Sequence, residues 1–312
     1  MRTTSSAPSP VERLEDRTLL AATASLFGGV LRVGGDAGSA NLINIRNSAD
    51  GTMIDVTIDY VNRRNEPRQL VKSFSKALGI SAIQVRGGGR ADTILVGQAN
   101  PDLGIAAFAL PARVIGGAGD DTIRLTDAAN FVNAGAGNDN VTTGAGHDVI
   151  FAGAGNDVVG AGDGDDWIRG MLGDDNLEGG GGNDRINAGL GNDVVGGGQG
   201  NDTVRGELGN DTLEGGPDND LLFGGLGNDT VRGGGGDDHL WGGAGDDTVE
   251  GGQGNDTLGG ILGTNVLLGG PGADTFRVRD LALNPTNDFN AADGDILEVV
   301  TARTEGPKPP AI

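Results

Sequence analysis

Carboxylate side chains recur at a fixed spacing of nine residues between Gly116 and Arg277. Cut into nines, this stretch gives eighteen consecutive blocks without an insertion or deletion, and position six is Asp in sixteen of them, with Asn130 and Asn265 in the other two. Regularly spaced carboxylates are ligands for a hard cation, and calcium accepts about six to eight oxygens in a tolerant geometry, whereas magnesium demands a strict octahedron. The sequence therefore predicts metal ligands at Asp121, Asp139, Asp148, Asp157, Asp166, Asp175, Asp184, Asp193, Asp202, Asp211, Asp220, Asp229, Asp238, Asp247, Asp256 and Asp274.

The block around each aspartate has the consensus G-G-x-G-(N/D)-D-x-U-x, where U is a large apolar residue. Two neighbouring blocks, GGQGNDTVR and GELGNDTLE, show this pattern. Position four is glycine in sixteen of the eighteen blocks, with Ala128 and Asp218 as the exceptions, which indicates backbone angles that a Cβ would disfavour. We therefore expect a turn over positions one to six and a short strand over positions seven to nine.

Position eight is apolar in all eighteen blocks, and this excludes a disordered linker, the usual state of a chain rich in glycine and aspartate. Neighbouring residues of a strand face opposite ways, so position eight is expected to point inward while positions seven and nine face solvent. One apolar residue per block buries little by itself, so the blocks must stack in two facing layers, with two blocks in each coil. The expected core residues are Ile123, Val132, Val141, Ile150, Val159, Ile168, Leu177, Ile186, Val195, Val204, Leu213, Leu222, Val231, Leu240, Val249, Leu258, Leu267 and Phe276.

The blocks resemble the RTX (repeats-in-toxin, haemolysin-type) calcium-binding nonapeptide repeats, and the resemblance covers about half of the chain. It implies an all-β fold, a right-handed parallel β-roll (β-solenoid) with eighteen residues per coil, strands in two sheets and turns along two edges. In the family, each ion lies between turns one coil apart, held by the position-six carboxylates of both turns and by turn carbonyls. Carried over to this chain, the resemblance implies about fourteen Ca²⁺ ions in two edge arrays.

On such a coil, the aspartates from Asp121 to Asp247, taken every eighteen residues, line one edge, and those from Asp148 to Asp274 line the other. Successive coils stack about 4.8 Å apart. Two carboxylates at that distance repel by about 3.5 kcal/mol at an effective dielectric constant of about 20. Summed along both edges, this repulsion exceeds the net stability of about 5–15 kcal/mol that is typical of a domain. The sequence therefore predicts that the roll folds only with calcium.

The chain as a whole is acidic, with a formal net charge of −22 over 312 residues, and it contains no cysteine. The charge of about fourteen calcium ions would offset this acidity. The acidic balance and the aromatic content of 4% argue against nucleic acid and anionic membrane as partners, because both require a basic surface. No transmembrane segment is expected, since no stretch approaches about 18 consecutive apolar residues.

The N-terminal region carries a motif that indicates export. Residues Val11–Ala22 (VERLEDRTLLAA) resemble the LEPR-XLL type of motif found on exported and surface proteins of certain bacteria, although Glu15-Asp16-Arg17 stands where that family often has Glu-Pro-Arg. Calcium sites exposed at a solenoid edge also resemble extracellular modules, whose dissociation constants are about 10⁻⁴–10⁻³ M. We therefore expect an extracellular or cell-surface location.

The hydrophobic pattern changes outside the eighteen blocks. From Gly28 to Val85, apolar and polar residues alternate, which predicts half-buried strands. The segment GGGRADTIL at Gly87–Leu95 is a degenerate block that lies out of phase by two residues, and whether its Asp92 binds calcium stays open.

After the last block, residues Asp288–Val299 resemble the segment that commonly follows RTX arrays. Its apolar side chains, Phe289, Ile296, Leu297 and Val299, are expected to cover the end of the solenoid. The expected organisation is a disordered export-associated segment (1–27), a β-rich N-terminal cap with degenerate repeats (28–115), the β-roll (116–277), and a C-terminal cap with a loose tail (278–312).

Residue types suited to catalysis are few and scattered, so we expect no enzyme activity. His147 falls at position five of its block and His239 at position seven, and both are expected to be structural. The H-E-x-x-H, G-x-S-x-G and Walker motifs are absent from the sequence.

The function predicted from the sequence is that of a calcium-binding secreted or cell-surface structural protein whose repeat array folds on binding calcium outside the cell. One alternative is a binding module for an acidic polysaccharide or a cell-surface layer, and others are an epimerase-like β-roll and a toxin-derived fragment. An epimerase-like surface requires a groove of aromatic, basic and acidic residues. Trp167, Trp241, Arg169 and Arg205 are too few and too unpatterned in the sequence to predict one.

Overall fold

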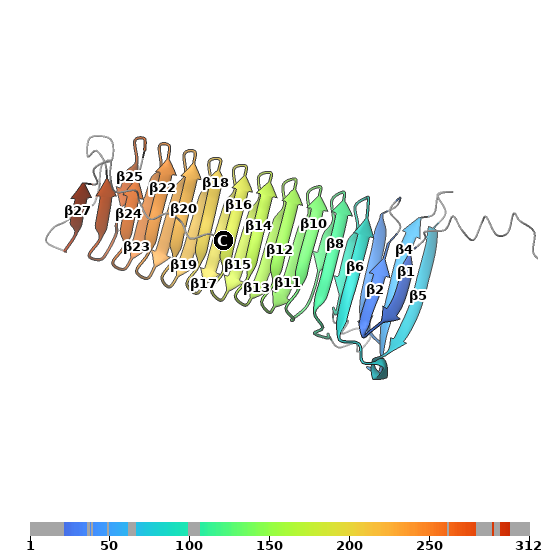
Figure 1. Ribbon diagram of the computed structural model, residues 1–312. Helices are drawn as coiled ribbons and strands as arrows, with labels where there is room; N and C mark the ends of the chain where they lie inside the picture. The colour runs from blue at the N-terminus through green and yellow to red at the C-terminus, as the bar shows by residue number, and fades with distance from the viewer. Residues whose placement is uncertain are drawn as a thin grey trace, which may run out of the picture.

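The chain forms two long, mostly parallel β-sheets that lie face to face along one rod (Figure 1). This computed structural model describes residues 22–35, 38, 40–48, 50–61, 67–98, 107–260, 262–278, 289 and 294–299. The described residues form strands β1 to β27 and one short 3-10 helix, η1 (Lys76–Leu78). The expected all-β parallel β-solenoid is confirmed.

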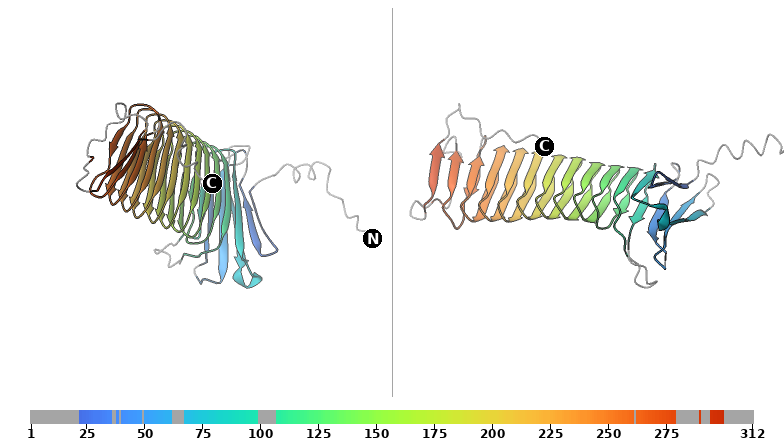
Figure 2. Two further views of the ribbon diagram at one scale, coloured as in Figure 1. Left: turned by 60° about the vertical axis from the view of Figure 1, so that its left-hand side comes forward. Right: turned by 60° about the horizontal axis from the view of Figure 1, so that its bottom comes forward.

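Sheet A contains fourteen strands and runs the length of the rod, as Figure 2 shows from two further sides. Its strands, in spatial order, are β1 (Thr23–Phe27), β2 (Val30–Gly34), β6 (Ala82–Gly88), β8 (Ala112–Ala118), β10 (Phe131–Ala136), β12 (Val149–Ala154), β14 (Trp167–Leu172), β16 (Arg185–Leu190), β18 (Thr203–Leu208), β20 (Leu221–Leu226), β22 (His239–Ala244), β24 (Thr257–Gly260), β26 (Thr275–Val278) and β27 (Ile296–Val299).

Sheet B contains thirteen strands and forms the second layer. Its strands, in spatial order, are β5 (Pro67–Ser75), β4 (Met53–Val61), β3 (Asn41–Asn47), β7 (Thr93–Val96), β9 (Thr122–Arg124), β11 (Asn140–Ala145), β13 (Val158–Asp163), β15 (Asn176–Gly181), β17 (Val194–Gln199), β19 (Thr212–Pro217), β21 (Thr230–Gly235), β23 (Thr248–Gln253) and β25 (Val266–Leu268).

The coil contains eighteen residues, as the two-block argument requires. Strand β18 pairs in parallel with β20, and Val204 lies opposite Leu222, eighteen residues later. All eighteen position-eight side chains are buried between the two sheets in one hydrophobic core, with Phe276 the largest of them. The core prediction is therefore confirmed.

The expected division of each block into turn and strand was wrong. The regular strands are six residues long and run from position seven through position three of the next block, as in Thr203–Leu208, so only positions four to six form the turn. Positions two and three still pair with the neighbouring coils, as Glu207 and Leu208 do with Gly225 and Leu226. Position two does so in the left-handed region, where Gly234 has φ +116° and Met171 and Glu207 hold positive φ angles without being glycine.

The N-terminal end of the rod continues the coil and then closes it with antiparallel strands. Strands β6 and β7 pair in parallel with the array, and Ile94 lies opposite Ile123. Strand β1 then pairs antiparallel with β2, while β4 and β5 add antiparallel to β3. Strand β1 lies within the segment that we expected to be disordered. It is ordered instead, because its Ala24 faces inward and packs on the same core.

The C-terminal end carries strand β27, which adds in parallel to β26. Leu297 packs against the core, and the ring of Phe289 contacts that of Phe276 edge-on at 6.2 Å. Ile296 and Val299 were expected to help cover the end of the solenoid, but they are 55% and 54% exposed. Ile296 faces away from the core because it precedes the inward-packing Leu297, and Val299 is the last residue of the strand. In the part of the chain that the structure describes, no helix is long and apolar enough to cross a membrane.

Candidate metal centre

Each position-six aspartate lies buried at the junction of a turn and the following strand, and one of its carboxylate oxygens joins successive coils. The backbone N–H of Asp184 donates to Oδ1 of Asp202 at 2.7 Å, and the N–H of Asp202 donates to Oδ1 of Asp220 at 2.8 Å. The same bond recurs along both edges of the rod. The structure thus brings the sixteen predicted aspartates together in two ladders, one through Asp121 and the other through Asp148.

The second carboxylate oxygen, Oδ2, of the ladder aspartates from Asp121 to Asp256 is buried and has no hydrogen-bond partner among the described residues. Asp202 illustrates the burial, with 1% of its surface exposed. We expected these sites to be exposed at the edge of the solenoid, and that expectation was wrong, because the carboxylates fold inward beside the backbone. A buried, ionised oxygen without a partner is strongly disfavoured unless it binds a cation.

Position one, which is glycine in twelve of the eighteen blocks, lies against this second oxygen. A Cβ on Gly197 would collide with Oδ2 of Asp202 and would lie 2.7 Å from the carbonyl oxygen of Gly215 in the next coil. A carboxylate oxygen and a backbone carbonyl therefore converge beside the glycine, and both are donors that calcium prefers. The residues present thus fit the ion that the repeats imply.

Carboxylates alone do not complete the coordination shell. Among the residues described, no group of three or more His, Cys, Asp and Glu side chains could hold a metal ion. Each ion would instead take two aspartates from successive coils and fill the rest of its shell with turn carbonyls.

The two asparagines in the ladders show where those carbonyls point. Oδ1 of Asn130 accepts the N–H of Ala112 at 3.1 Å, as a ladder aspartate would. Its side-chain amide donates to the carbonyl of Ala128 at 2.6 Å and to that of Thr126 at 3.3 Å. In this turn an amide N–H therefore binds the carbonyls that a cation would bind in the other turns.

Another turn carries a hydroxyl in the corresponding place. Thr143 stands at position one, and its Oγ1 donates to the carbonyl of Ala161 at 2.7 Å. Burial raises the pKa of Asp148, the ladder aspartate of the same turn.

Burial shifts the ladder aspartates towards their protonated form. It raises the pKa of Asp202 to about 7; the N–H of Asp184 opposes this rise and the nearby charge of Asp220 adds to it. The pKa of Asp184 and of Asp175 is also raised to about 7, again mainly by burial. A cation at these sites must therefore compete with protons near neutral pH.

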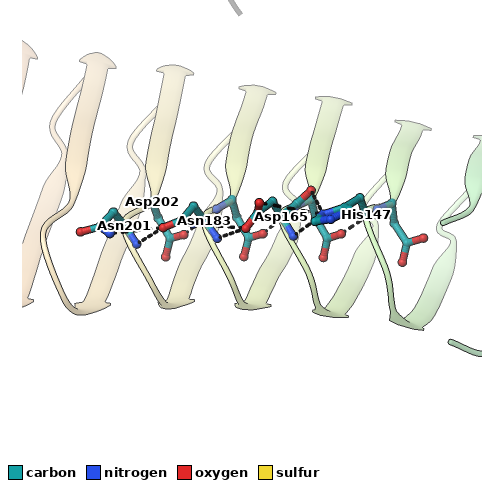
Figure 3. Close-up of polar contacts among 8 residues, drawn as sticks. His147, Asp165, Asn183, Asn201 and Asp202 are labelled. Carbon is teal, nitrogen blue, oxygen red and sulfur yellow. Dashed lines mark hydrogen bonds and ion pairs between the residues drawn. The ribbon is translucent and has the colours of Figure 1, made fainter. Parts of the chain in front are cut away.

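The exposed residues at position five form a second pair of ladders that run in the opposite direction (Figure 3). The N–H of Asn183 donates to Oδ1 of Asp165 at 2.8 Å, and the N–H of Asn201 donates to Oδ1 of Asn183 at 2.9 Å. His147 belongs to this series, because its Nδ1 accepts the N–H of Asp165 at 2.9 Å. The prediction that His147 is an exposed structural residue is thus confirmed, and each turn is bonded to the coils on both sides.

Two ladder residues lay outside the predicted set. Asp92 is 2% exposed, its N–H donates to Oδ1 of Asp121 at 2.6 Å, and its own Oδ2 has no partner. Asp295 accepts the N–H of Asp274 through Oδ1 at 3.0 Å. These steps span 29 and 21 residues instead of eighteen, so a search at a fixed period misses them, although position six of GGGRADTIL already held Asp92.

Together, the parallel coil and the buried aspartate ladders define a calcium-binding β-roll. Residues 113–140, 125–159, 160–195, 196–231 and 223–258 match the family described as RTX calcium-binding nonapeptide repeat (4 copies). The roll between residues 113 and 258 therefore belongs to the RTX calcium-binding repeats. No curated protein shows significant similarity to the chain.

Proposed function

We propose that this chain is a secreted or cell-surface structural protein whose RTX array folds when it binds calcium outside the cell. The observation that carries the proposal is the row of buried Oδ2 atoms without partners in both ladders. The sixteen aspartates predicted from the sequence would be the ligands, and Asp92 would join them. The role proposed for the array is structural and not catalytic.

The number of ions follows from the intervals between neighbouring aspartates. Seven intervals lie along each edge, so the two ladders would hold about fourteen ions, and the Asp92–Asp121 interval would raise the number to about fifteen. A representative ion would bind Asp184 and Asp202 together with carbonyls of the two turns. The asparagines would end or interrupt the series, since an amide N–H does not bind a cation.

Folding would be coupled to these ions because the empty array is disfavoured. Each buried oxygen without a partner costs about 1–3 kcal/mol. Sixteen of the described aspartates, Asp92 and the fifteen ladder residues from Asp121 to Asp256, carry such an oxygen, and their summed cost is at least comparable with a domain stability of about 5–15 kcal/mol. Calcium would convert each of these oxygens into a ligand, and each ion would order two turns at once, which makes the transition cooperative.

An extracellular location agrees with the chemistry of the sites. Competition with protons at a pKa of about 7, as for Asp202, lowers the apparent calcium affinity. Sites with dissociation constants of about 10⁻⁴–10⁻³ M would fill outside the cell and not in the cytosol. The export motif supports the same location, and nearly all of it lies outside the described residues.

Removal of calcium tests the proposal. We expect the far-UV circular dichroism of the full chain to change from coil-like in excess chelator to β-rich on titration with calcium, with a midpoint between about 10⁻⁴ and 10⁻³ M. Magnesium at the same concentration is the control and should not restore the β signal. An unchanged β spectrum in chelator would refute the coupling, and a submicromolar midpoint would refute the extracellular assignment.

A further inference from the structure

Both aspartate ladders begin, at the N-terminal end of the rod, with an asparagine. In the ladder through Asp121, the first residue is Asn41, which is 3% exposed and whose backbone N–H donates to Oδ1 of Asp92 at 2.7 Å. In the other ladder it is Asn130, whose N–H donates in the same way to Oδ1 of Asp148 at 2.6 Å. The first interval of each ladder therefore contains one carboxylate instead of two.

The side-chain amide of Asn41 lies where a ladder aspartate has its second oxygen. A Cβ on Gly35 would lie 2.6 Å from Nδ2 of Asn41 and would collide with the carbonyl oxygen of Gly87 in the next coil. In a regular turn, a Cβ on Gly197 would meet Oδ2 and a carbonyl oxygen of the next coil in the same way. Nδ2 of Asn41 donates to the carbonyl of Gly87 at 3.3 Å and to Oδ1 of Asp92 at 2.8 Å. The amide therefore contacts a carbonyl and a carboxylate, the groups that an ion would contact in the array.

The N-terminal cap, here strands β1 to β8 (residues 23–118), buries more apolar side chains per strand than the array (Figure 1). Strand β4 fully buries Ile54, Val56 and Ile58. An array strand such as β15 buries one large side chain, Leu177, beside a glycine. Strands β4 and β5 also pair antiparallel over nine residues, without the glycine turn of the repeat. Apolar burial and local pairing therefore favour the fold of the cap without a metal ion.

The carboxylates of the N-terminal cap have protein donors in place of ions. At the surface, Asp55 accepts a hydrogen bond from the hydroxyl of Ser73 at 2.6 Å, and Asp59 accepts one from the amide of Gln69 at 2.6 Å. Among the described residues of the cap, Asp92 is the one aspartate that belongs to a ladder, and its Oδ1 accepts the two N–H groups described above. The repulsion between successive ladder carboxylates therefore begins where the cap ends.

The C-terminal end of the rod lacks this arrangement. Asn265 ends one ladder there, but the other ladder continues through Asp256 and Asp274 to Asp295. In the described part of the chain, sheet B ends at β25, a strand of three residues, and sheet A ends at β27, a strand of four. At the N-terminal end, β8 in sheet A pairs with β10 and β7 in sheet B pairs with β9. A new coil can therefore add to the cap in both sheets at once.

We infer that the N-terminal cap folds without calcium and is the template on which the array folds, coil by coil, when calcium binds. The inference rests on the proposed calcium-coupled folding of the array and adds a direction to it. The first coil of a solenoid is costly because it has no neighbour, whereas each later coil gains the interface with the coil before it. A folded cap removes that initial cost, so coils add from β9 and β10 towards β26.

Hydrogen exchange of the full chain, measured peptide by peptide with mass spectrometry, tests this inference. In excess chelator, we expect slow exchange in peptides from β3 to β6 and exchange like that of an unfolded chain in peptides from β10 to β24. After calcium is added, pulse labelling should show protection first in β10 to β13 and last in β21 to β24. The coil-like circular dichroism expected in chelator then describes the array, which contains most of the strands.

Asn41→Asp tests the role of the amide. It keeps the backbone N–H that binds Asp92 but replaces the side-chain amide by a second carboxylate, so protection of β3 and β6 in chelator should fall about tenfold. Saturating calcium should restore that protection and raise bound calcium by about one ion, because the interval then has two carboxylates. The matched control is Asn44→Asp, which makes the same chemical change on the outward side of β3, between the buried Ile43 and Ile45, and should leave cap protection unchanged.

The outcomes separate this inference from the proposed function. Fast exchange of the cap in chelator, with an array that gains protection on calcium addition, would overturn the inference and leave calcium-coupled folding intact. Slow exchange of both regions in chelator would refute the coupled folding on which the inference rests. Protection that appears first in β21 to β24 would overturn the proposed direction. Unchanged cap protection in Asn41→Asp, or a loss that calcium does not restore, would show that the amide does not stand in for an ion.

Discussion

Substitution of Asp202 by asparagine separates the two roles of a ladder aspartate. The asparagine side chain would keep the Oδ1 that accepts the N–H of Asp184, but it would replace Oδ2 by an amide N–H. Asn130 already shows this arrangement, with its amide bonded to turn carbonyls. We therefore expect the coil to persist while the ions on both sides of position 202, towards Asp184 and Asp220, are lost.

The effect of Asp202→Asn on folding stability depends on calcium, and its sign differs between the calcium-loaded and the calcium-free protein. At free calcium tenfold above the dissociation constant, each ion stabilises the folded state by about 1.4 kcal/mol, so loss of two ions costs up to about 3 kcal/mol. Without calcium, the substitution removes a buried oxygen that has no hydrogen-bond partner and a carboxylate whose charge is repelled by that of Asp220. Asp202→Asn should therefore weaken the calcium-loaded protein and favour folding of the calcium-free protein.

The assay is bound calcium per chain after equilibrium dialysis, combined with thermal unfolding at high calcium and in chelator. Asn201→Asp is the matched control, because it adds a carboxylate at the neighbouring exposed position and preserves the acceptor for the N–H of Asn219. We expect a loss of about two ions for Asp202→Asn and none for the control. Full calcium content in Asp202→Asn, or equal losses in both variants, would refute the ladder model.

Three further predictions follow from the same geometry. Asp92→Asn should lower bound calcium by about one ion, whereas Asp55→Asn on β4, outside both ladders, should leave it unchanged. Equal calcium content in Asp92→Asn and the wild type would exclude the added site. Burial raises the folded-state pKa of aspartates such as Asp202 to about 7 from an ordinary value of 3.8, so protonation stabilises the calcium-free roll. The β content of the calcium-free protein should therefore increase as pH falls from about 7 towards 4 and should not increase further below that. A calcium-free circular dichroism spectrum that is independent of pH would contradict this prediction. Gly234→Ala should lower the unfolding free energy by about 1–3 kcal/mol, because Gly234 has φ +116° and a Cβ there would collide with the backbone of Gly216. The control Gly235→Ala should be nearly neutral, because no atom lies within 4 Å of the added Cβ. Urea unfolding at saturating calcium measures both.

The sequence by itself determined the coil, the core and most of the candidate ligands. The uninterrupted nine-residue period puts Val204 and Leu222 in adjacent strands and Asp184, Asp202 and Asp220 on one edge, because strand alternation and a two-layer stack leave no other arrangement that buries position eight. These are local constraints repeated in every block, so they can be derived from residue order alone.

Only the tertiary structure decided which atoms of each turn meet and where the ladders end. Whether an aspartate faces solvent or folds inward depends on the backbone of the neighbouring coil, which supplies the N–H for Oδ1 and closes over Oδ2. Asp92 and Asp295 enter the ladders across coils of irregular length, where spacing in the sequence no longer measures distance in space. Arg169, Arg205 and Trp241 are likewise 36 residues apart in the chain, but parallel pairing of successive coils places them only two strands apart in sheet A.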